Sequence, residues 1–514
     1  MKNLIELVKI LTRRKISKIE ILDPQTIKDQ SNFYTQFYNG ILSGEFKSER
    51  DVSQKIYGTN ELTTKFRKLK SRFTKRVLNT FFFININEEK ISNIDKALII
   101  CQKQLALTHI LLYYKAKKTA KDVAKKTLTT SRKFEIHFVS IQLAQILRNL
   151  SIQENDKKQV QSYSNLIKDL ISLIEVEEEV RNLISDIKLL YEEGTISPKN
   201  IEVINQKSDR ISHLGGQVQS AFINQKDYEA WLIRKNLEGA FQDIIEMSDH
   251  FMINIMDKPE IYKINIIPYI RLHQIKALLQ MSNFDQAEKL AKSAQEQLQK
   301  SHSTYLEFTQ TYLRIALNEE KYFNAFAIFE SLKGEDFLMQ ISKPELEKWE
   351  VCNLLIHFIV WETPNRILKI EKKAQLQSWQ RQVFIQKELP DIKSFGELEL
   401  HICFLKILLH QEKRKIQAYI EMLKAYCAKN ASKQKIKRLR LFSKCLSNWE
   451  RTNFSATKFH PKSASYKNLC ESSFYYNRKG YTFEAIRFEK LLVRVLKAHS
   501  TDFEGSEWNT HTLH

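Results

Sequence analysis

The chain of 514 residues carries a formal net charge of +21 and contains only 11 Gly and 8 Pro. This length exceeds what one hydrophobic core usually holds, so we expect several domains or a repeat array. The scarcity of turn-forming residues excludes an all-β chain, which needs a turn signal about every ten residues, and the ample apolar content excludes global disorder.

The charge is unevenly distributed along the chain. Basic residues predominate in residues 1–150 and again in 401–470, whereas 151–400 is acidic overall and 471–514 is balanced. Such asymmetry indicates an anionic partner, which is nucleic acid, a membrane surface or an acidic protein. The alternative is compositional drift, because Lys is abundant throughout and lacks the planar fork with which Arg grips phosphate.

The N-terminal segment predicts a short amphipathic helix over residues 3–12, a short strand over 15–23 and a helix over 25–43. Charged residues break the first apolar run and no small-residue cleavage site follows, so we expect an amphipathic helix here and not a signal peptide. No apolar run is long enough to span a bilayer, and the longest candidate, 351–361, suits a buried helix. We therefore expect a cytoplasmic protein without a membrane span.

A helix over residues 48–57, a turn at Gly58 and a further helix from about Glu61 suggest a helix-turn-helix unit within 48–79. Gln54 departs from that motif, because a small residue is expected there. The alternative is a helix whose apolar stripe packs while its charges face water. The basic residues of the second helix are candidate contacts for an anionic partner: Lys65, Arg67, Lys68, Arg72, Lys75 and Arg76.

From about residue 92 the apolar periodicity predicts one helix after another. The expected helices cover residues 93–116, 117–134, 134–153, 156–173 and 173–194. The linkers between helices are too short for flexible interdomain tethers, which favours a continuous array.

An internal similarity is the most specific feature of the sequence. The pattern of apolar, aromatic and small residues in 275–298 recurs in 313–332, 38 residues later. The positions expected to pack within these repeats are Leu278, Phe284, Ala287, Ala291, Ala294, Ala316, Tyr322, Ala325 and Phe329.

Over residues 268–333 this pattern resembles the tetratricopeptide repeat, a helix–turn–helix of about 34 residues. The usual Trp, Gly and Pro of that repeat are missing. The resemblance implies a curved stack of helical hairpins whose inner surface binds a peptide or protein. The alternative is generic antiparallel helices with Ala at close contacts.

We predict an all-α protein, a helical-hairpin (tetratricopeptide-like) solenoid with a small basic N-terminal domain. The expected divisions are a basic helical domain over 1–90, a helical-repeat array over 91–400, basic helical hairpins over 401–500 and a frayed tail over 501–514.

A second basic region covers residues 413–440 and interleaves cations with aromatic side chains. Tyr419, Met422 and Tyr426 recur at helical spacing, which favours a core position over base stacking. The candidate contacts for an anionic partner are Lys433, Lys435, Lys437, Arg438 and Arg440, with a solvated helix as the alternative.

Signatures of catalysis are absent from the sequence. It contains no phosphate-binding glycine loop, no metalloprotease motif and no nucleophile elbow, and its six Cys and 13 His lack metal-ligand spacing. We therefore expect a non-enzymatic cytoplasmic scaffold or adaptor, without metal or cofactor, that binds a protein or peptide along a helical-repeat surface. The alternative is a nucleic-acid-binding or regulatory protein that uses segments 48–79 and 413–440.

Overall fold

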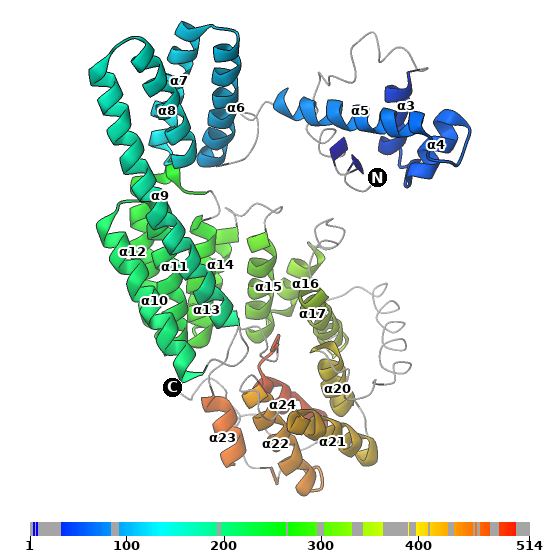
Figure 1. The fold of residues 1–514 in the computed structure, drawn as a ribbon. Helices are drawn as coiled ribbons and strands as arrows, with labels where there is room; N and C mark the ends of the chain where they lie inside the picture. The colour runs from blue at the N-terminus through cyan, green and yellow to red at the C-terminus, as the bar shows by residue number, and fades with distance from the viewer. Residues whose placement is uncertain are drawn as a thin grey trace. The chain divides into compact units, whose positions relative to one another are not determined.

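The computed structural model describes residues 4–5, 7–8, 32–83, 92–192, 197–263, 266–295, 303–331, 343–362, 389, 397–409, 412–429, 436–455, 458–459, 463–472 and 483–499. Every regular element within these ranges is a helix (Figure 1), which confirms the predicted all-α class for the described part of the chain. The strand expected at 15–23 and the tail at 501–514 lie outside the described residues.

Contacts divide the chain into two compact units, Met1–Leu170 and Ile171–His514. The four divisions expected from the sequence stay predictions. The first unit begins with a group of helices around a core in which the Phe37 and Phe73 rings stack with centroids 4.5 Å apart. These elements are α3 (Phe33–Leu42), α4 (Glu49–Tyr57), α5 (Thr64–Thr80) and the short 3-10 helix η1 (Phe81–Phe83).

Local signals fix the ends of α4. The Ser48 hydroxyl accepts a hydrogen bond from the backbone N–H of Asp51, and the Asp51 carboxylate accepts one in return from the N–H of Ser48. Gly58 ends the helix with φ 70°, a left-handed conformation that glycine adopts without strain. The turn expected at Gly58 is therefore present, while α5 begins at Thr64 rather than near Glu61.

The first unit continues through three helices and the first part of a fourth, α9, which extends past Leu170 into the second unit; short turns join the four. They are α6 (Asn93–Tyr113), α7 (Lys117–Lys133), α8 (His137–Gln153) and α9 (Lys157–Glu192). Two separate helices were expected where α9 lies, over 156–173 and 173–194, and this expectation is wrong. No Gly or Pro interrupts residues 157–192, so the helical hydrogen bonds continue without a break.

The turns after α6, α7 and α8 share one backbone geometry. Lys115, Glu135 and Asn155, spaced 20 residues apart, have φ values of 61°, 54° and 55°. After each, the next N–H bonds a carbonyl five residues earlier, as in the 2.7 Å bond from Ile136 to Ser131. This is the Schellman ending, in which glycine is the usual left-handed residue. The same turn therefore occurs three times, each time with a residue other than glycine in the left-handed position.

The second unit is a succession of helices that form several hydrophobic cores, one after another along the chain. Figure 1 shows them in chain order from green to red. They are α10 (Pro198–Gln217), α11 (Ala221–Glu238), α12 (Phe241–Asp257), α13 (Ile266–Gln280), α14 (Phe284–Gln295), α15 (Ser303–Asn318), α16 (Tyr322–Glu330), α17 (Lys343–Glu362), α20 (Glu397–Leu409), α21 (Lys413–Lys429), α22 (Lys437–Arg451), α23 (Ala464–Glu471) and α24 (Phe488–Ala498), with the 3-10 helix η3 (Pro259–Ile261) after α12.

The nine repeat-packing positions fall in one hydrophobic core. Seven of these side chains are buried, and Tyr322 and Phe329 are half-buried against the same core. Helix α13 packs on α14 and helix α15 on α16, so the described part forms the two helical hairpins that the repeated pattern places there. The three residues of α21 that were expected to face a core, Tyr419, Met422 and Tyr426, also pack against it.

Within the described ranges, none of the helices is long and apolar enough to cross a membrane. The apolar run at 351–361 forms part of α17, and its described side chains from Val351 to Ile356 are buried or half-buried. For these six side chains the burial expected of the run is observed, and the side chains of 357–361 lie outside the described residues.

A left-handed residue that is not glycine carries a steric cost of about 1 kcal/mol. We expect Glu135→Gly to raise the melting temperature of the array, because it removes that cost at the turn between α7 and α8. Thermal unfolding followed by circular dichroism measures the change. The matched control is Lys125→Gly, an exposed position inside α7, which should lower the melting temperature instead. Equal effects of the two changes would contradict the assignment of the turn.

Candidate functional site

The basic residues of α5 lie on its water-facing sides. Phe66, Leu69, Phe73 and Val77 are buried, and the helix presents its cations away from this stripe. All six predicted contacts are exposed: Lys65, Arg67, Lys68, Arg72, Lys75 and Arg76. Within the described part of the chain none of the six forms an ion pair, although the Arg76 guanidinium lies 4.3 Å from the centre of the Tyr34 ring. The helix is thus both a packed helix and a cationic surface.

The second basic region is divided by the structure. Lys437 is exposed, Arg440 is half-buried, and Lys433 and Lys435 lie outside the described residues. Arg438 is only 7% exposed and forms two ion pairs, so its prediction as a contact for an anionic partner is wrong. Arg438 lies on the buried face of α22, next to Leu439. Carboxylates from another segment neutralise its charge there.

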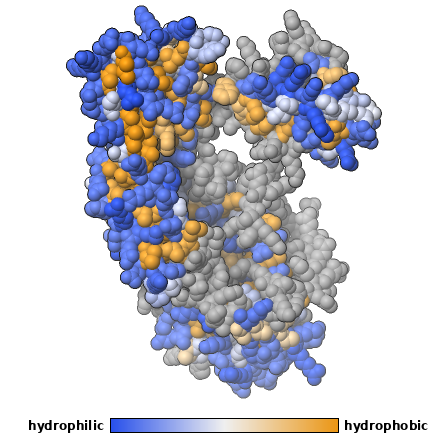
Figure 2. Space-filling model, viewed as in Figure 1, coloured by the Kyte–Doolittle hydropathy of each residue, from blue (hydrophilic) through white to orange (hydrophobic). Residues whose placement is uncertain are grey.

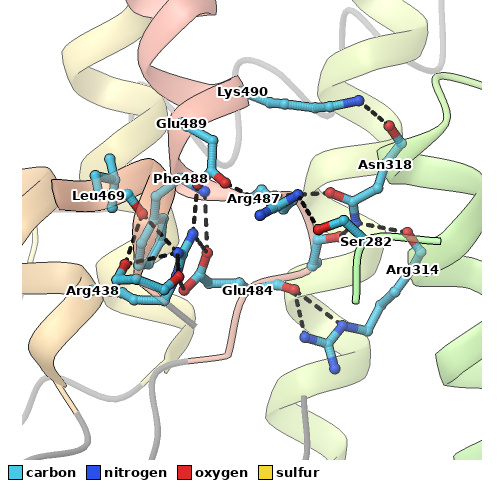
Figure 3. Close-up of polar contacts among 12 residues, drawn as sticks. Ser282, Arg314, Asn318, Arg438, Leu469, Glu484, Arg487, Phe488, Glu489 and Lys490 are labelled. Atoms are coloured by element: carbon cyan, nitrogen blue, oxygen red, sulfur yellow. Dashed lines mark hydrogen bonds and ion pairs between the residues drawn. The ribbon is translucent and has the colours of Figure 1, made fainter. Parts of the chain in front are cut away.

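Arg438 is the centre of a buried polar network (Figure 3). Its guanidinium binds both carboxylate oxygens of Glu484, at 2.7 and 3.1 Å, and one oxygen of Glu489 at 2.5 Å. It also donates to the carbonyl oxygens of Leu469 and Ser472. Burial raises the pKa of Glu484, and the positive charge of Arg438 opposes this shift. The network joins α22, the end of α23 and the start of α24.

Residues 483–487, which precede α24, form a non-helical segment that bends at Ala485 and Ile486 and lies against α15. The Arg314 guanidinium donates two hydrogen bonds, of 3.0 and 2.7 Å, to the Glu484 carbonyl oxygen. The Asn318 amide donates to the Ala485 carbonyl at 3.0 Å and accepts from the Arg487 N–H at 3.0 Å (Figure 3). Two α15 side chains therefore bind main-chain atoms of a segment about 170 residues away in sequence.

Further polar side chains of α9, α11, α13 and α15 gather in the same unit. Glu229 accepts from Lys188 at 2.6 Å and from Lys226 at 2.7 Å, and Lys276 pairs with Glu307 at 2.5 Å. Burial raises the pKa of Glu229, but the two lysines lower it by more, so it lies below its ordinary value.

His273 lies within this polar cluster, with its ring 4.6 Å from the Tyr269 ring. Burial lowers the pKa of the His273 imidazole to about 3, and the charge of Lys276 lowers it further, against the opposing effect of Glu307 and Glu229. The imidazole is therefore neutral at physiological pH.

Helix α6 exposes an apolar face. Ile110 is 54% exposed, Tyr113 82% and Tyr114, which caps the end of the helix, 75%. Four further large apolar side chains of the helix are exposed: Leu98, Ile99, Ile100 and Leu107. Figure 2 shows apolar side chains gathered on the surface formed by α6–α9. A large exposed apolar patch on a protein often marks a binding site, whereas single exposed apolar residues are common and have no such meaning. The sequence carried a signal for this face, since α6 is apolar on several sides instead of along one stripe.

The described residues offer little for covalent or metal chemistry. Burial raises the pKa of the Cys352, Cys403 and Cys445 thiols to about 12, so these groups hold their protons at neutral pH. No group of His, Cys, Asp or Glu within the described ranges is arranged to hold a metal ion.

Comparisons with known proteins give no match: no family model, no curated protein and no solved structure is similar to this chain. The chain is therefore not assigned to a family, and its function is argued from its own residues.

The buried position of Arg438 generates a stability prediction. Removing one partner of a buried ion pair leaves the other charge uncompensated, which costs about 3–5 kcal/mol. We expect Arg438→Met to lower the free energy of unfolding by this amount in urea denaturation. The neighbouring exposed Lys437→Met is the matched control and should change it by less than about 0.5 kcal/mol. Similar values for both variants would show that the network contributes nothing.

The low pKa of His273 generates a prediction on pH dependence. Unfolded His binds a proton below pH 6.5, whereas folded His273 binds one only near pH 3. The unfolded state takes up more protons in this window, so stability falls as the pH falls from 6.5 towards 3.

We expect His273→Gln to reduce the loss of stability between pH 6.5 and 4.5. The carboxylates are the same in both proteins, so the difference between the two pH profiles reports on His273. The measurement is the urea midpoint as a function of pH. His250→Gln, at an exposed position of α12, is the control and should leave the slope unchanged. An unchanged slope in the His273 variant would refute the assignment.

Proposed function

We propose that this chain is a non-enzymatic scaffold or adaptor that binds a protein partner along its helical-repeat surface. The observation that carries the proposal is the apolar face of α6. Burying large apolar side chains is the main favourable term in protein association, and folding normally covers such residues. Exposing Ile110, Tyr113 and Tyr114 on one helix is therefore costly unless a partner covers them.

The surroundings of this face favour a partner with acidic groups. Lys115, Lys117 and Lys118 follow directly after the exposed tyrosines and are themselves exposed. An apolar centre with a polar, charged rim is the usual anatomy of a protein interface. The tetratricopeptide-like character of the hairpins belongs to the same proposal and is supported by the helix-on-helix packing and the short turns. A cytoplasmic location is proposed with it.

A second function, binding of nucleic acid, is favoured by one observation. Six exposed cations project from α5, a helix of 17 residues, with no ion pair among the described residues. Phosphate binding by such a surface depends steeply on salt, because it releases counterions. Binding by the apolar face of α6 depends little on salt.

One experiment separates the two functions. The full chain is compared with two variants, one with Leu107, Ile110 and Tyr113 of α6 changed to Ser, the other with Lys65, Arg67, Lys68 and Arg72 of α5 changed to Glu. Each is assayed for proteins retained from an extract of its own cells at low and high salt, and for labelled random DNA and RNA. We expect the α6 variant to lose a salt-resistant protein and the α5 variant to keep it.

The control for the α6 variant is Lys125→Ser with Lys126→Ser, two exposed positions of α7. It should keep the partner. Nucleic-acid binding that persists near physiological salt and is abolished only by the α5 changes would make the second function the right one. Retention of every partner by the α6 variant would remove the support for the first.

A further inference from the structure

The exposed apolar residues of α6 recur every seven residues along one side of the helix. They form two neighbouring rows, which are Ile99, Ala106 and Tyr113 in the first and Ile100, Leu107 and Tyr114 in the second. Lys103 and Ile110, also seven residues apart, lie between the rows. A seven-residue apolar repeat is the pattern with which one helix packs along another, because seven residues make almost two turns. The face therefore has the form that a second helix fits.

This face points away from the helices on which α6 packs. Ala97, Cys101 and Leu105 are buried on the side where α6 contacts α7 and α8. A helix turns by about 100° for each residue, so the nine residues from Cys101 to Ile110 place these two side chains on opposite sides of α6. The packing of α6 on its neighbours therefore leaves both rows exposed.

The charges at one end of this face are basic. Lys115, Lys117 and Lys118 follow the last exposed tyrosines and are exposed. The Lys117 ammonium donates to the Gln153 side chain at 2.8 Å, whereas Lys115 and Lys118 form no ion pair within the described part of the chain. A partner that places carboxylates at this end gains from charge complementarity.

The helix dipole selects the direction of such a partner. Helix α6 ends at Tyr113, so its partially negative end lies beside the lysines. A helix that runs antiparallel to α6 brings its partially positive N-terminus to the same end. Carboxylates are stabilising in the first turn of a helix and unfavourable in the last. Only the antiparallel direction therefore satisfies the dipoles and the charges together.

A second copy of this chain fits the face less well. Two antiparallel copies would meet about a two-fold axis between Ala106 and Leu107, which brings Lys96 of each copy close to Lys117 of the other. Asp95 is the one acidic residue in the first turn of α6, and its carboxylate already accepts from the Ser92 hydroxyl at 2.5 Å. Like charges that face each other oppose association, which favours a different protein.

We propose that the exposed face of α6 binds one amphipathic helix of a partner protein, and that this helix lies antiparallel to α6 and carries carboxylates in its first turn. The inference deepens the proposed function, on which it rests, by giving the secondary structure, direction and charge of the partner's contact.

The test uses the full chain and two synthetic helical peptides as long as α6. Both carry Leu and Ile at alternating spacings of three and four residues, with Ala and Gln elsewhere. The first peptide has Glu in its first two turns and Lys in its last two, and the second has these charges exchanged. Fluorescence anisotropy measures the Kd. We expect the first peptide to bind about fivefold more tightly at low salt, with a smaller difference at high salt.

Exchanging the charges also changes the helicity of the free peptides, so the ratio of the two Kd values is compared between chains. Lys115→Glu with Lys118→Glu should reverse the preference, because the carboxylates of the first peptide then meet like charges. The matched control is Lys125→Glu with Lys126→Glu, at exposed positions inside α7, and it should leave the ratio unchanged. The same ratio in all three chains overturns the proposal.

The apolar rows are tested by changing Leu107, Ile110 and Tyr113 to Ser. These side chains are exposed, so the changes leave the core intact, and we expect either peptide to bind about tenfold more weakly. Equal binding would mean that the peptides bind elsewhere on the chain and overturns the proposal. Sedimentation of the unchanged chain tests the second copy. A dimer that the same three changes dissociate would make that copy the occupant and also overturns the proposal.

Failure of this inference is distinguishable from failure of the proposed function, because the peptide assays contain no partner from cells. Suppose that the chain binds neither peptide, while the α6 variant still loses a protein from the extract. The inference is then overturned and the proposed function stands. Binding of the peptides as expected, with every cellular partner retained by the α6 variant, supports the geometry of the face and removes the support for the proposed function.

Discussion

The architecture depends on one constraint, which is that a helical hairpin cannot bury its apolar face alone. Ala120 and Ala124 of α7 are fully buried, as are Ala287 and Ala291 of α14, because small residues let neighbouring helices approach closely. Each helix then relies on the next one to complete its core. In the second unit α24 meets this need by returning to pack on α20 and α22. In the first unit α6 packs on α7 and α8 and still exposes apolar residues.

The return of α24 brings an irregular segment into the core, and its main-chain polar groups need partners there. Arg314 and Asn318 satisfy the carbonyls of Glu484 and Ala485, and Arg438 neutralises the Glu484 carboxylate. A buried ion pair is stabilising only in a geometry that fits it well, so this network is weak evidence for stability and stronger evidence for a defined position. Arg314 and Asn318 therefore hold the segment through its main-chain atoms, whatever its side chains are.

Local sequence patterns predicted most of the helices, but they could not predict contacts between segments that are distant in sequence. Buried Phe66 and Phe73 could be placed on one stripe from their spacing alone, as could Ala287 and Ala291. Arg438 was misplaced, because a run of cations reads as a solvated face unless the carboxylates that neutralise it are known. Glu484 lies 46 residues away from Arg438, and nothing in the intervening sequence connects the two. The Arg314 and Asn318 contacts were missed for the same reason.

Exposed residues differ in how much they say about function. An exposed lysine is fully solvated and costs nothing, so the cations of α5 are compatible with binding phosphate and equally with facing water. An exposed apolar side chain forgoes about 25 cal/mol for each Å² that a neighbour would cover. Tyr113 and Ile110 therefore carry more information than Lys65 and Arg72, although the basic residues are the more conspicuous in the sequence. On this argument the apolar face of α6 ranks before the cationic face of α5.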